Sequence, residues 1–219
     1  AEQQLLEELI DGAKPSITPL MNGRNQPLHY LLSTTFRYPP LKWGSLFVRP
    51  FEPSLLYGAT TLPTGLAEVA YYRLVLLKGM STPPPIGRIR SEHSAFIVRY
   101  RSEMAVRLQN SSFAAFTDQL QHSSNYDATQ QLGSDMRNAG VQLFEYRSAR
   151  CSSIATGDGI NAAMFTPEPL LDHEPQQLSE WLCETRLESV AFRRKQQRGE
   201  VYEFMAEQFF ENGEIPCPA

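Results

Sequence analysis

The stretch from Leu56 to Arg73 constrains the fold most, because a single acid interrupts an otherwise apolar helical pattern there. The residues before Gly58 predict a short strand, and residues 60–65 predict a turn with the chemistry of a helix start. Residues 66–77 predict an apolar helix that is buried on most sides. The acid in this helix is Glu68, and burying its carboxylate is unfavourable unless the group is paired or lines a wet cleft.

Glu68 has two interpretations. In the structural one, the N-terminus of the helix and an arginine stabilise an acid that serves only the fold. In the functional one, the carboxylate faces a substrate that carries positive charge. The residues of this stretch leave both interpretations open.

Length and charge narrow the class of protein. The 219 residues suit one full-sized domain, and predicted strands outnumber predicted helices, which favours a single α+β domain. The net charge of −4 argues against a nucleic-acid backbone as the main partner. No apolar run is long enough to span a membrane, so the sequence predicts a soluble, cytoplasmic protein.

Cysteine and histidine usage predicts neither a disulfide framework nor a metal site. The 3 cysteines are widely spaced and the 4 histidines are scattered. The sequence motifs of zinc proteases, serine hydrolases and P-loop proteins are missing. The pair Gly157 and Gly159 lacks the third glycine of a dinucleotide-binding turn. A reducing compartment fits this pattern best.

The N-terminal part is expected to be an arm rather than part of the domain. Residues 1–13 predict an acidic amphipathic helix, which packs either on the domain or on a partner. Residues 14–27 are rich in Pro, Asn and Gly and predict a linker or an irregular cover. We therefore divide the chain into an N-terminal helical arm over residues 1–27 and a domain over residues 28–219.

Two arginines near the start of this domain are candidates for binding an anion. Arg37 is expected in an extended stretch, and Arg49 follows a second apolar-polar alternation. A guanidinium suits a pyrophosphate because its planar fork matches phosphate oxygens. The alternative for each is a solvated or Glu-paired arginine.

The second half of the chain alternates strand and helix patterns. Residues 93–100 and 104–108 predict a hairpin, residues 124–139 predict a helix, and residues 141–150 predict a strand whose end delivers Ser148 and Arg150. Further expectations are a short strand over residues 161–165, a short helical patch around Trp181 and Cys183, and a last hairpin formed by residues 187–194 and 201–210.

A set of short motifs occurs in a fixed order along the chain: Phe36-Arg37-Tyr38-Pro39-Pro40, Gly44-Ser45, Leu56-Tyr57-Gly58-Ala59, Leu66 to Arg73, Leu132-Gly133, Met136-Arg137, Tyr146 to Arg150, and Asn161 before Phe165. In this order the motifs resemble the RES-domain family, the toxin half of toxin–antitoxin pairs whose antitoxin carries an Xre-type DNA-binding domain. The resemblance runs from about residue 29 to residue 167, and the tail over residues 181–218 is also similar.

The resemblance implies a fold like that of the ADP-ribosyltransferases and an activity that uses NAD⁺ as a substrate. Members of the family cleave the nicotinamide–ribose bond by hydrolysis or phosphorolysis, or transfer ADP-ribose to a protein. Tyr57 lies eleven positions before Glu68 and corresponds to the family's active-site tyrosine, and Ser148 corresponds to its second-half serine. The alternative for Tyr57 is a core tyrosine with a satisfied hydroxyl, and that for Ser148 is a serine that caps a turn.

The same resemblance suggests a mechanism that needs no metal. The ribose carbon becomes cation-like as nicotinamide departs, as in glycoside cleavage, so fixed negative charge is required nearby. Glu68 is expected to oppose that charge and to hold a ribose hydroxyl, and Tyr57 is expected to stack on the nicotinamide. Arg37 and Arg49 are expected to hold the pyrophosphate, and Ser148 to donate to a phosphate or position the attacking group. Asn161 completes the set as a substrate-binding residue.

One position departs from the family's pattern. The family usually has arginine in a Gly-Ser-Arg-Phe motif, and the corresponding residue here is Leu46. Arg37 or Arg49 is expected to serve in place of the family's arginine. The alternatives to NAD⁺ cleavage are ADP-ribosylation of a host protein and a catalytically impaired binding protein, for which Leu46 is the best support.

Overall fold

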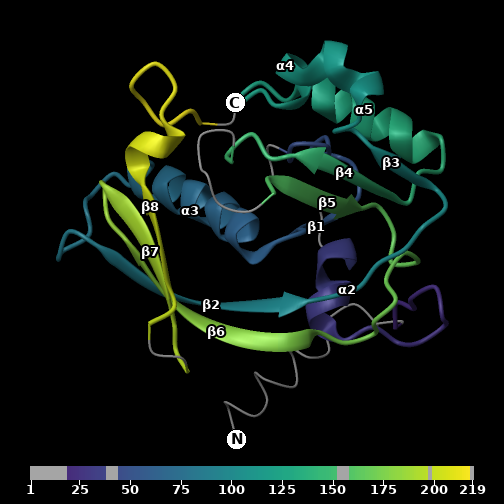
Figure 1. Ribbon diagram of the computed structural model, residues 1–219, viewed down its shortest axis with the longest axis horizontal. Coiled ribbons are helices and arrows are strands. Elements are labelled where there is room, and N and C mark those ends of the chain that lie inside the picture. Colours follow the sequence, from purple (N-terminus) through teal and green to yellow (C-terminus); the bar gives the residue numbers. More distant parts are fainter. Residues whose placement is uncertain (1–18, 38–43, 152–157, 197–198, 218–219) are drawn as a thin grey trace, which may run out of the picture.

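The computed structural model describes residues 19–37, 44–151, 158–196 and 199–217, and it contains two four-stranded sheets with a long helix, α3, between them (Figure 1). The described part of the chain also forms three further α-helices, so the mixed α+β class expected from the sequence is confirmed. The helix predicted for residues 1–13 lies outside the described residues.

The first sheet has the strand order β1-β5-β4-β3. β5 pairs antiparallel with both β1 and β4, whereas β3 runs parallel to β4. The strands are β1 (Leu56–Ala59), β3 (Ala105–Arg107), β4 (Leu143–Arg147) and β5 (Ile160–Met164). The strand and return predicted for residues 141–165 are therefore confirmed as the β4–β5 pair.

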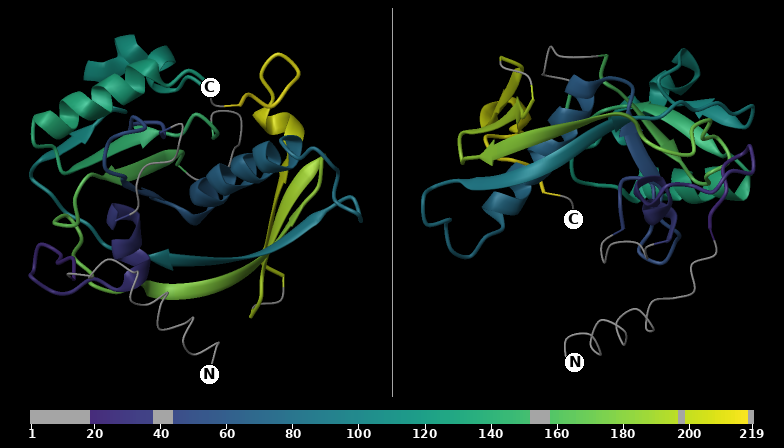
Figure 2. Two further views of the ribbon diagram at one scale, coloured as in Figure 1. Left: turned by 180° about the vertical axis from the view of Figure 1, so that it is seen from behind. Right: turned by 90° about the horizontal axis from the view of Figure 1, so that it is seen from below.

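Helices cover both faces of the first sheet (Figure 2). On one face, α4 (Thr117–Leu120) and α5 (Asp127–Asn138) pack over a core around Phe47 and Phe144. On the other face, α2 (Tyr30–Arg37) packs through Leu32 against alternate residues of β5. A short 3₁₀ helix, Ser111–Phe116, precedes α4.

The second sheet has the order β2-β6-β7-β8 and is antiparallel throughout. Its strands are β2 (Ile89–Ile97), β6 (Gln176–Thr185), β7 (Ser189–Arg194) and β8 (Val201–Met205), and a 3₁₀ turn over Ala206–Phe209 follows. The last hairpin predicted from the sequence is confirmed as the β7–β8 pair. Trp181 and Phe192 are fully buried on the face of this sheet that α3 covers.

The central helix is confirmed, although it begins earlier than expected. α3 spans Leu62–Lys78, and Pro63 lies in its first turn, where a missing backbone N–H and a fixed φ are favourable. Residues 60–65 therefore contribute most of a helical turn rather than a separate turn before the helix. Ala67, Ala70, Tyr71 and Leu74 pack against the second sheet. Among the described residues, no helix is both long and apolar enough to cross a membrane.

One sequence expectation near the start of the domain is wrong. Arg37 is the last residue of the helix α2, not part of an extended stretch, because burial of Leu32 on the first sheet outweighs the local preference of the β-branched residues beside it. The apolar-polar alternation before Arg49 forms a tight turn closed by a bridge between Ser45 and Val48.

Two further expectations fail on the second sheet. The predicted hairpin of residues 93–100 and 104–108 is wrong, because β2 pairs with β6 and β3 pairs with β4 in the other sheet. The helical patch predicted around Trp181 and Cys183 is also wrong, since both lie in β6. Trp181, Cys183 and Thr185 alternate inward at the period of a strand, and that alternation was the available signal.

Candidate active site

α3 has a second face whose character differs from that of its apolar face. Thr64, Glu68 and Tyr72 follow one another at four-residue spacing on this face. Thr64 is buried, Glu68 is partly buried, and Tyr72 is 49% exposed. The expectation that the helix is buried on most sides is confirmed, and this face is the exception because it runs from the interior to solvent. Glu68 lies at the boundary.

Two donors from the first sheet bind one carboxylate oxygen of Glu68. Ser148, directly after β4, donates from Oγ to Oε1 at 2.6 Å, and Asn161 of β5 donates from Nδ2 to the same oxygen at 2.7 Å. Ser148 and Asn161 are 3% and 2% exposed, respectively, so both donors are held rigidly. None of the described residues hydrogen-bonds Oε2. The carboxylate is thus fixed through Oε1 alone among the described residues.

The contacts of Glu68 do not match the structural interpretation. Glu68 lies beyond the first turn of α3, outside the range in which a helix N-terminus stabilises an acid strongly. No ion pair within the described ranges includes it. Its partners are neutral donors, which hold a carboxylate without neutralising its charge. This arrangement favours the functional interpretation.

Strand alternation brings the other candidate residues to the same face of the first sheet. Tyr57 of β1 pairs with Ala163, which is two residues from Asn161 and therefore on the same face. Tyr146 of β4 pairs directly with Asn161, and Ser148 follows Tyr146 by two positions. The face that contacts Glu68 is thus continuous with the face that carries Tyr57.

The contacts of Tyr57 are those of its alternative interpretation, a core tyrosine with a satisfied hydroxyl. Its hydroxyl lies 2.9 Å from Ser45 Oγ and accepts the backbone N–H of Phe47 at 3.2 Å. Burial raises the pKa of Tyr57 to about 12, so the phenol is neutral at physiological pH. Tyr57 therefore anchors the turn of residues 44–48 to the sheet, with its hydroxyl satisfied inside the protein.

Alkaline unfolding tests the environment of Tyr57. Below pH 10 both the folded and the unfolded state keep its proton, whereas between pH 10 and about 12 the unfolded state ionises first, so stability falls with rising pH. We expect the free energy of unfolding, measured with urea, to fall less steeply over this window in Tyr57→Phe than in the wild type. Equal slopes in the two proteins contradict a buried phenol at this position.

The two predicted arginines lie outside the Glu68, Ser148 and Asn161 cluster. Arg37 ends α2, which packs on the opposite face of the first sheet. Arg49 is exposed and donates to the side chain of Gln131 on α5. Hydrogen bonds therefore join three of the six predicted site residues directly.

Tyr72 was not among the predicted site residues, although its helical spacing from Glu68 was visible in the sequence. Its position four residues after Glu68 places the two side chains next to each other on a helix, and that spacing was the signal that pointed to it. About half of its surface is exposed, so its ring is accessible beside the carboxylate. Tyr72 therefore lies where this face of α3 meets solvent.

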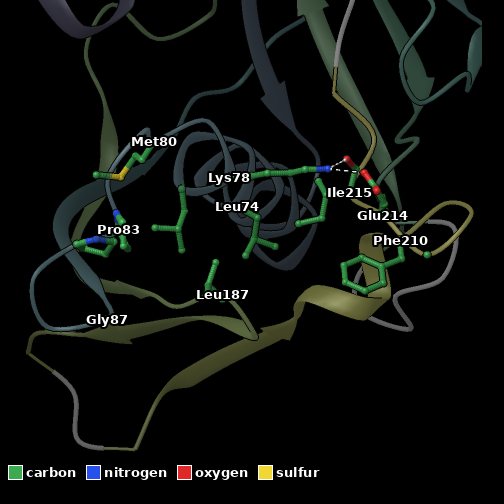
Figure 3. A pocket seen from close by; sticks show the side chains of 12 residues that line it. Leu74, Lys78, Met80, Pro83, Gly87, Leu187, Phe210, Glu214 and Ile215 are labelled. Atoms are coloured by element: carbon green, nitrogen blue, oxygen red, sulfur yellow. Dashed lines mark hydrogen bonds and ion pairs between the residues drawn. The ribbon is translucent and has the colours of Figure 1, made fainter.

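A separate groove lies at the other end of α3 (Figure 3). It has a volume of about 490 Å³, and Leu74, Met80, Leu187 and Phe210 line it. Lys78 and Glu214 also line the groove and form an ion pair at 2.9 Å. Glu68 is ten residues before Lys78, about 15 Å along the helix axis, so the groove is not part of the Glu68 site.

The fold and the site together define an α+β domain with two sheets, in which neutral donors from the first sheet hold one partly buried acid of the helix α3. The chain belongs to the RES domain family, whose model matches residues 23–186. The comparison with curated proteins found no match.

Proposed function

We propose that this protein is the toxin of a type II toxin–antitoxin pair and that it cleaves the nicotinamide–ribose bond of NAD⁺ by hydrolysis or phosphorolysis. The observation that carries the proposal is the geometry of Glu68, in a chain of the RES domain family. Its carboxylate is held through Oε1 by Ser148 and Asn161, and none of the described residues hydrogen-bonds Oε2.

The chemistry of the substrate explains why this geometry is useful. As nicotinamide leaves NAD⁺, positive charge develops on the ribose carbon. A preorganised carboxylate opposes that charge and accepts a hydrogen bond from a ribose hydroxyl through Oε2, an effect of about 3 kcal/mol or more in comparable sites. Because Ser148 and Asn161 already fix the side chain, little reorganisation is required during the reaction.

The remaining site residues have binding roles in this proposal. The fold is proposed to be like that of the ADP-ribosyltransferases, with the dinucleotide lying along the face of the first sheet that carries Tyr57. Tyr57 holds the turn of residues 44–48, and Arg49 at the end of that turn binds the pyrophosphate. Arg37 has no part in this pose, because α2 packs on the opposite face of the sheet. The accessible ring of Tyr72 offers a surface beside the nicotinamide.

The partner in this proposal is an antitoxin that carries an Xre-type DNA-binding domain and keeps the toxin inactive. DNA contacts belong to the antitoxin, which agrees with the net charge of −4 on this chain. Residues 1–27 are proposed as an arm outside the catalytic domain.

Incubation of the purified chain with NAD⁺ tests the proposed function. We expect nicotinamide release, together with free ADP-ribose if water is the acceptor or ADP-ribose 1″-phosphate if phosphate is. Mass spectrometry distinguishes these products from an ADP-ribosylated protein, the outcome of the transferase alternative. Expression without an antitoxin is expected to arrest growth and lower cellular NAD⁺. NAD⁺ that stays intact in both experiments contradicts the proposal.

A catalytically impaired binding protein is the second candidate, because of Leu46. Its side chain packs against the core around Phe47, so a leucine here is accommodated by the fold. The variant Leu46→Arg restores the family's arginine and separates the candidates. If the wild type is impaired, the variant gains nicotinamide release and toxicity; if it is active, both proteins already release nicotinamide.

A further inference from the structure

Arg150 is a buried arginine just after β4 that contacts two other parts of the protein. Only 7% of its surface is exposed. Its guanidinium carbon lies 3.6 Å from the centre of the Tyr71 ring on α3. Its Nη2 donates to the carbonyl of Ser123 at 2.7 Å and to the hydroxyl of Tyr126 at 3.0 Å. The side chain thus ties α3, the segment before α5 and the end of β4 together.

The electrostatics of Arg150 are unusual for a buried charge. Within the described ranges, none of the ion pairs includes it. A buried cation without an acid is unfavourable unless aromatic and hydrogen-bond partners compensate for lost hydration, and the contacts with Tyr71, Ser123 and Tyr126 serve this purpose. An apolar side chain of similar volume would fill the space without this requirement, so packing alone does not account for an arginine here.

The backbone of Arg150 leads directly to the site. Its N–H donates to Ser148 Oγ at 3.0 Å, and Ser148 Oγ in turn donates to Glu68 Oε1 at 2.6 Å. Because Ser148 Oγ accepts from Arg150, its own hydrogen is left for the carboxylate. Ser148 therefore does cap a turn, as its alternative interpretation states. The same turn directs its hydroxyl towards Glu68.

We propose that Arg150 is a positioning residue, whose guanidinium clamps the end of β4 between Tyr71 and Tyr126 so that the Ser148 hydroxyl stays aimed at Glu68. The expected effect of Arg150 on the reaction rate rests on the proposed function. Its effect on the position of the Ser148 hydroxyl does not. A planar guanidinium is required because it stacks on a ring and donates in plane at the same time, which a lysine ammonium cannot do.

A double-mutant cycle on nicotinamide release tests the proposal. Arg150→Lys keeps the charge but loses the planar stack, and we expect its kcat to fall about 10- to 100-fold with KM changed less than about threefold, as for a misplaced catalytic group. In a Ser148→Ala background the same substitution is expected to lower kcat less than about threefold, because the group it positions is already gone. An equal loss in both backgrounds overturns the proposal.

Matched variants separate positioning from folding. Arg193→Lys changes an exposed arginine of β7 on the second sheet and is expected to leave kcat unchanged. Tyr126→Phe removes one acceptor of Arg150 without removing the charge, and it is expected to lower kcat in the same direction by about threefold. If Arg150→Lys does not fold, an unchanged kcat in Tyr126→Phe contradicts the proposal.

A crystal structure of Arg150→Lys gives a readout that does not depend on activity. The distance between Ser148 Oγ and Glu68 Oε1 is 2.6 Å in the wild type and is expected to exceed hydrogen-bond length in the variant. A distance that stays at the wild-type value overturns the positioning role. A wild type that releases no nicotinamide overturns the proposed function instead, and this distance still decides the inference about Arg150.

Discussion

Glu68→Gln is expected to reduce nicotinamide release from NAD⁺ at least about a hundredfold while the domain stays folded. Glutamine has the same shape, and its carbonyl oxygen can take the place of Oε1 and accept from Ser148 and Asn161 as before. Its amide nitrogen then occupies the position of Oε2, so a neutral donor replaces a charged acceptor where the ribose is expected to bind.

The stability of this variant is expected to stay within about 1 kcal/mol of the wild type, because no described ion pair is broken and the carboxylate is only partly buried. Thermal unfolding checks the fold, and chromatographic quantification of nicotinamide checks the rate. Glu207→Gln is the matched control, since Glu207 is exposed on the second-sheet side of the protein. Unchanged turnover in Glu68→Gln, with a normal unfolding curve, refutes the proposed mechanism.

Local patterns were sufficient for elements whose stability is local. Residues 124–139 showed a helix pattern followed by Gly140, and α5 ends at Asn138 with Gly140 at a φ of +77°. The β7–β8 hairpin was also predictable, because its two strands are close in sequence and separated by a polar turn. In both cases the residues that define the element are also those that stabilise it.

Strand partners were not predictable in the same way. Alternation in β2 and β3 indicates which side chains are buried, but it carries no information on which strand lies alongside. β2 pairs with β6, which is far along the chain, so the predicted local hairpin was wrong. The helix α2 was missed for a similar reason, since its stability depends on contacts of Leu32 with residues of β5.

The candidate site was likewise predictable only where a local pattern marks it. The helix pattern identified Glu68 as an anomalous acid, whereas Ser148 and Asn161 were named through the family resemblance. Hydrogen bonds join Glu68 to Ser148 and Asn161 across 80 and 93 positions of sequence, and no periodicity spans such distances. Arg150 was named only at a strand end and within the motif Tyr146 to Arg150, and neither gave it a role, because Tyr71 and Tyr126 become its neighbours only in the folded chain.

Gly133→Ala is expected to lower the free energy of unfolding by about 3 kcal/mol or more, the largest stability effect we expect from so small a change. A Cβ on Gly133 of α5 would lie 2.0 Å from the carbonyl oxygen of Phe47. Both groups belong to the backbone, so no rotamer change relieves the overlap, and α5 or the turn of residues 44–48 must move.

That movement reaches the candidate site. Phe47 is fully buried, with its ring centroid 4.7 Å from that of Phe144, and its N–H binds the Tyr57 hydroxyl. Displacing the turn therefore disturbs the core and the anchor of Tyr57 together. Chemical denaturation measures the loss of stability, and the alkaline slope assigned to Tyr57 is expected to weaken in the same variant.

Gly65→Ala is the matched control, because Gly65 is also a helical glycine but has space for a methyl group. A Cβ there would lie 3.5 Å from Ala59 Cβ, an ordinary contact, so the substitution is expected to stabilise α3 by about 0.5–1 kcal/mol. Both substitutions replace a helical glycine by alanine. We expect Gly133→Ala to lower the free energy of unfolding and Gly65→Ala to raise it. If Gly133→Ala proves as stable as Gly65→Ala, the close packing of α5 on the turn that holds Tyr57 is refuted.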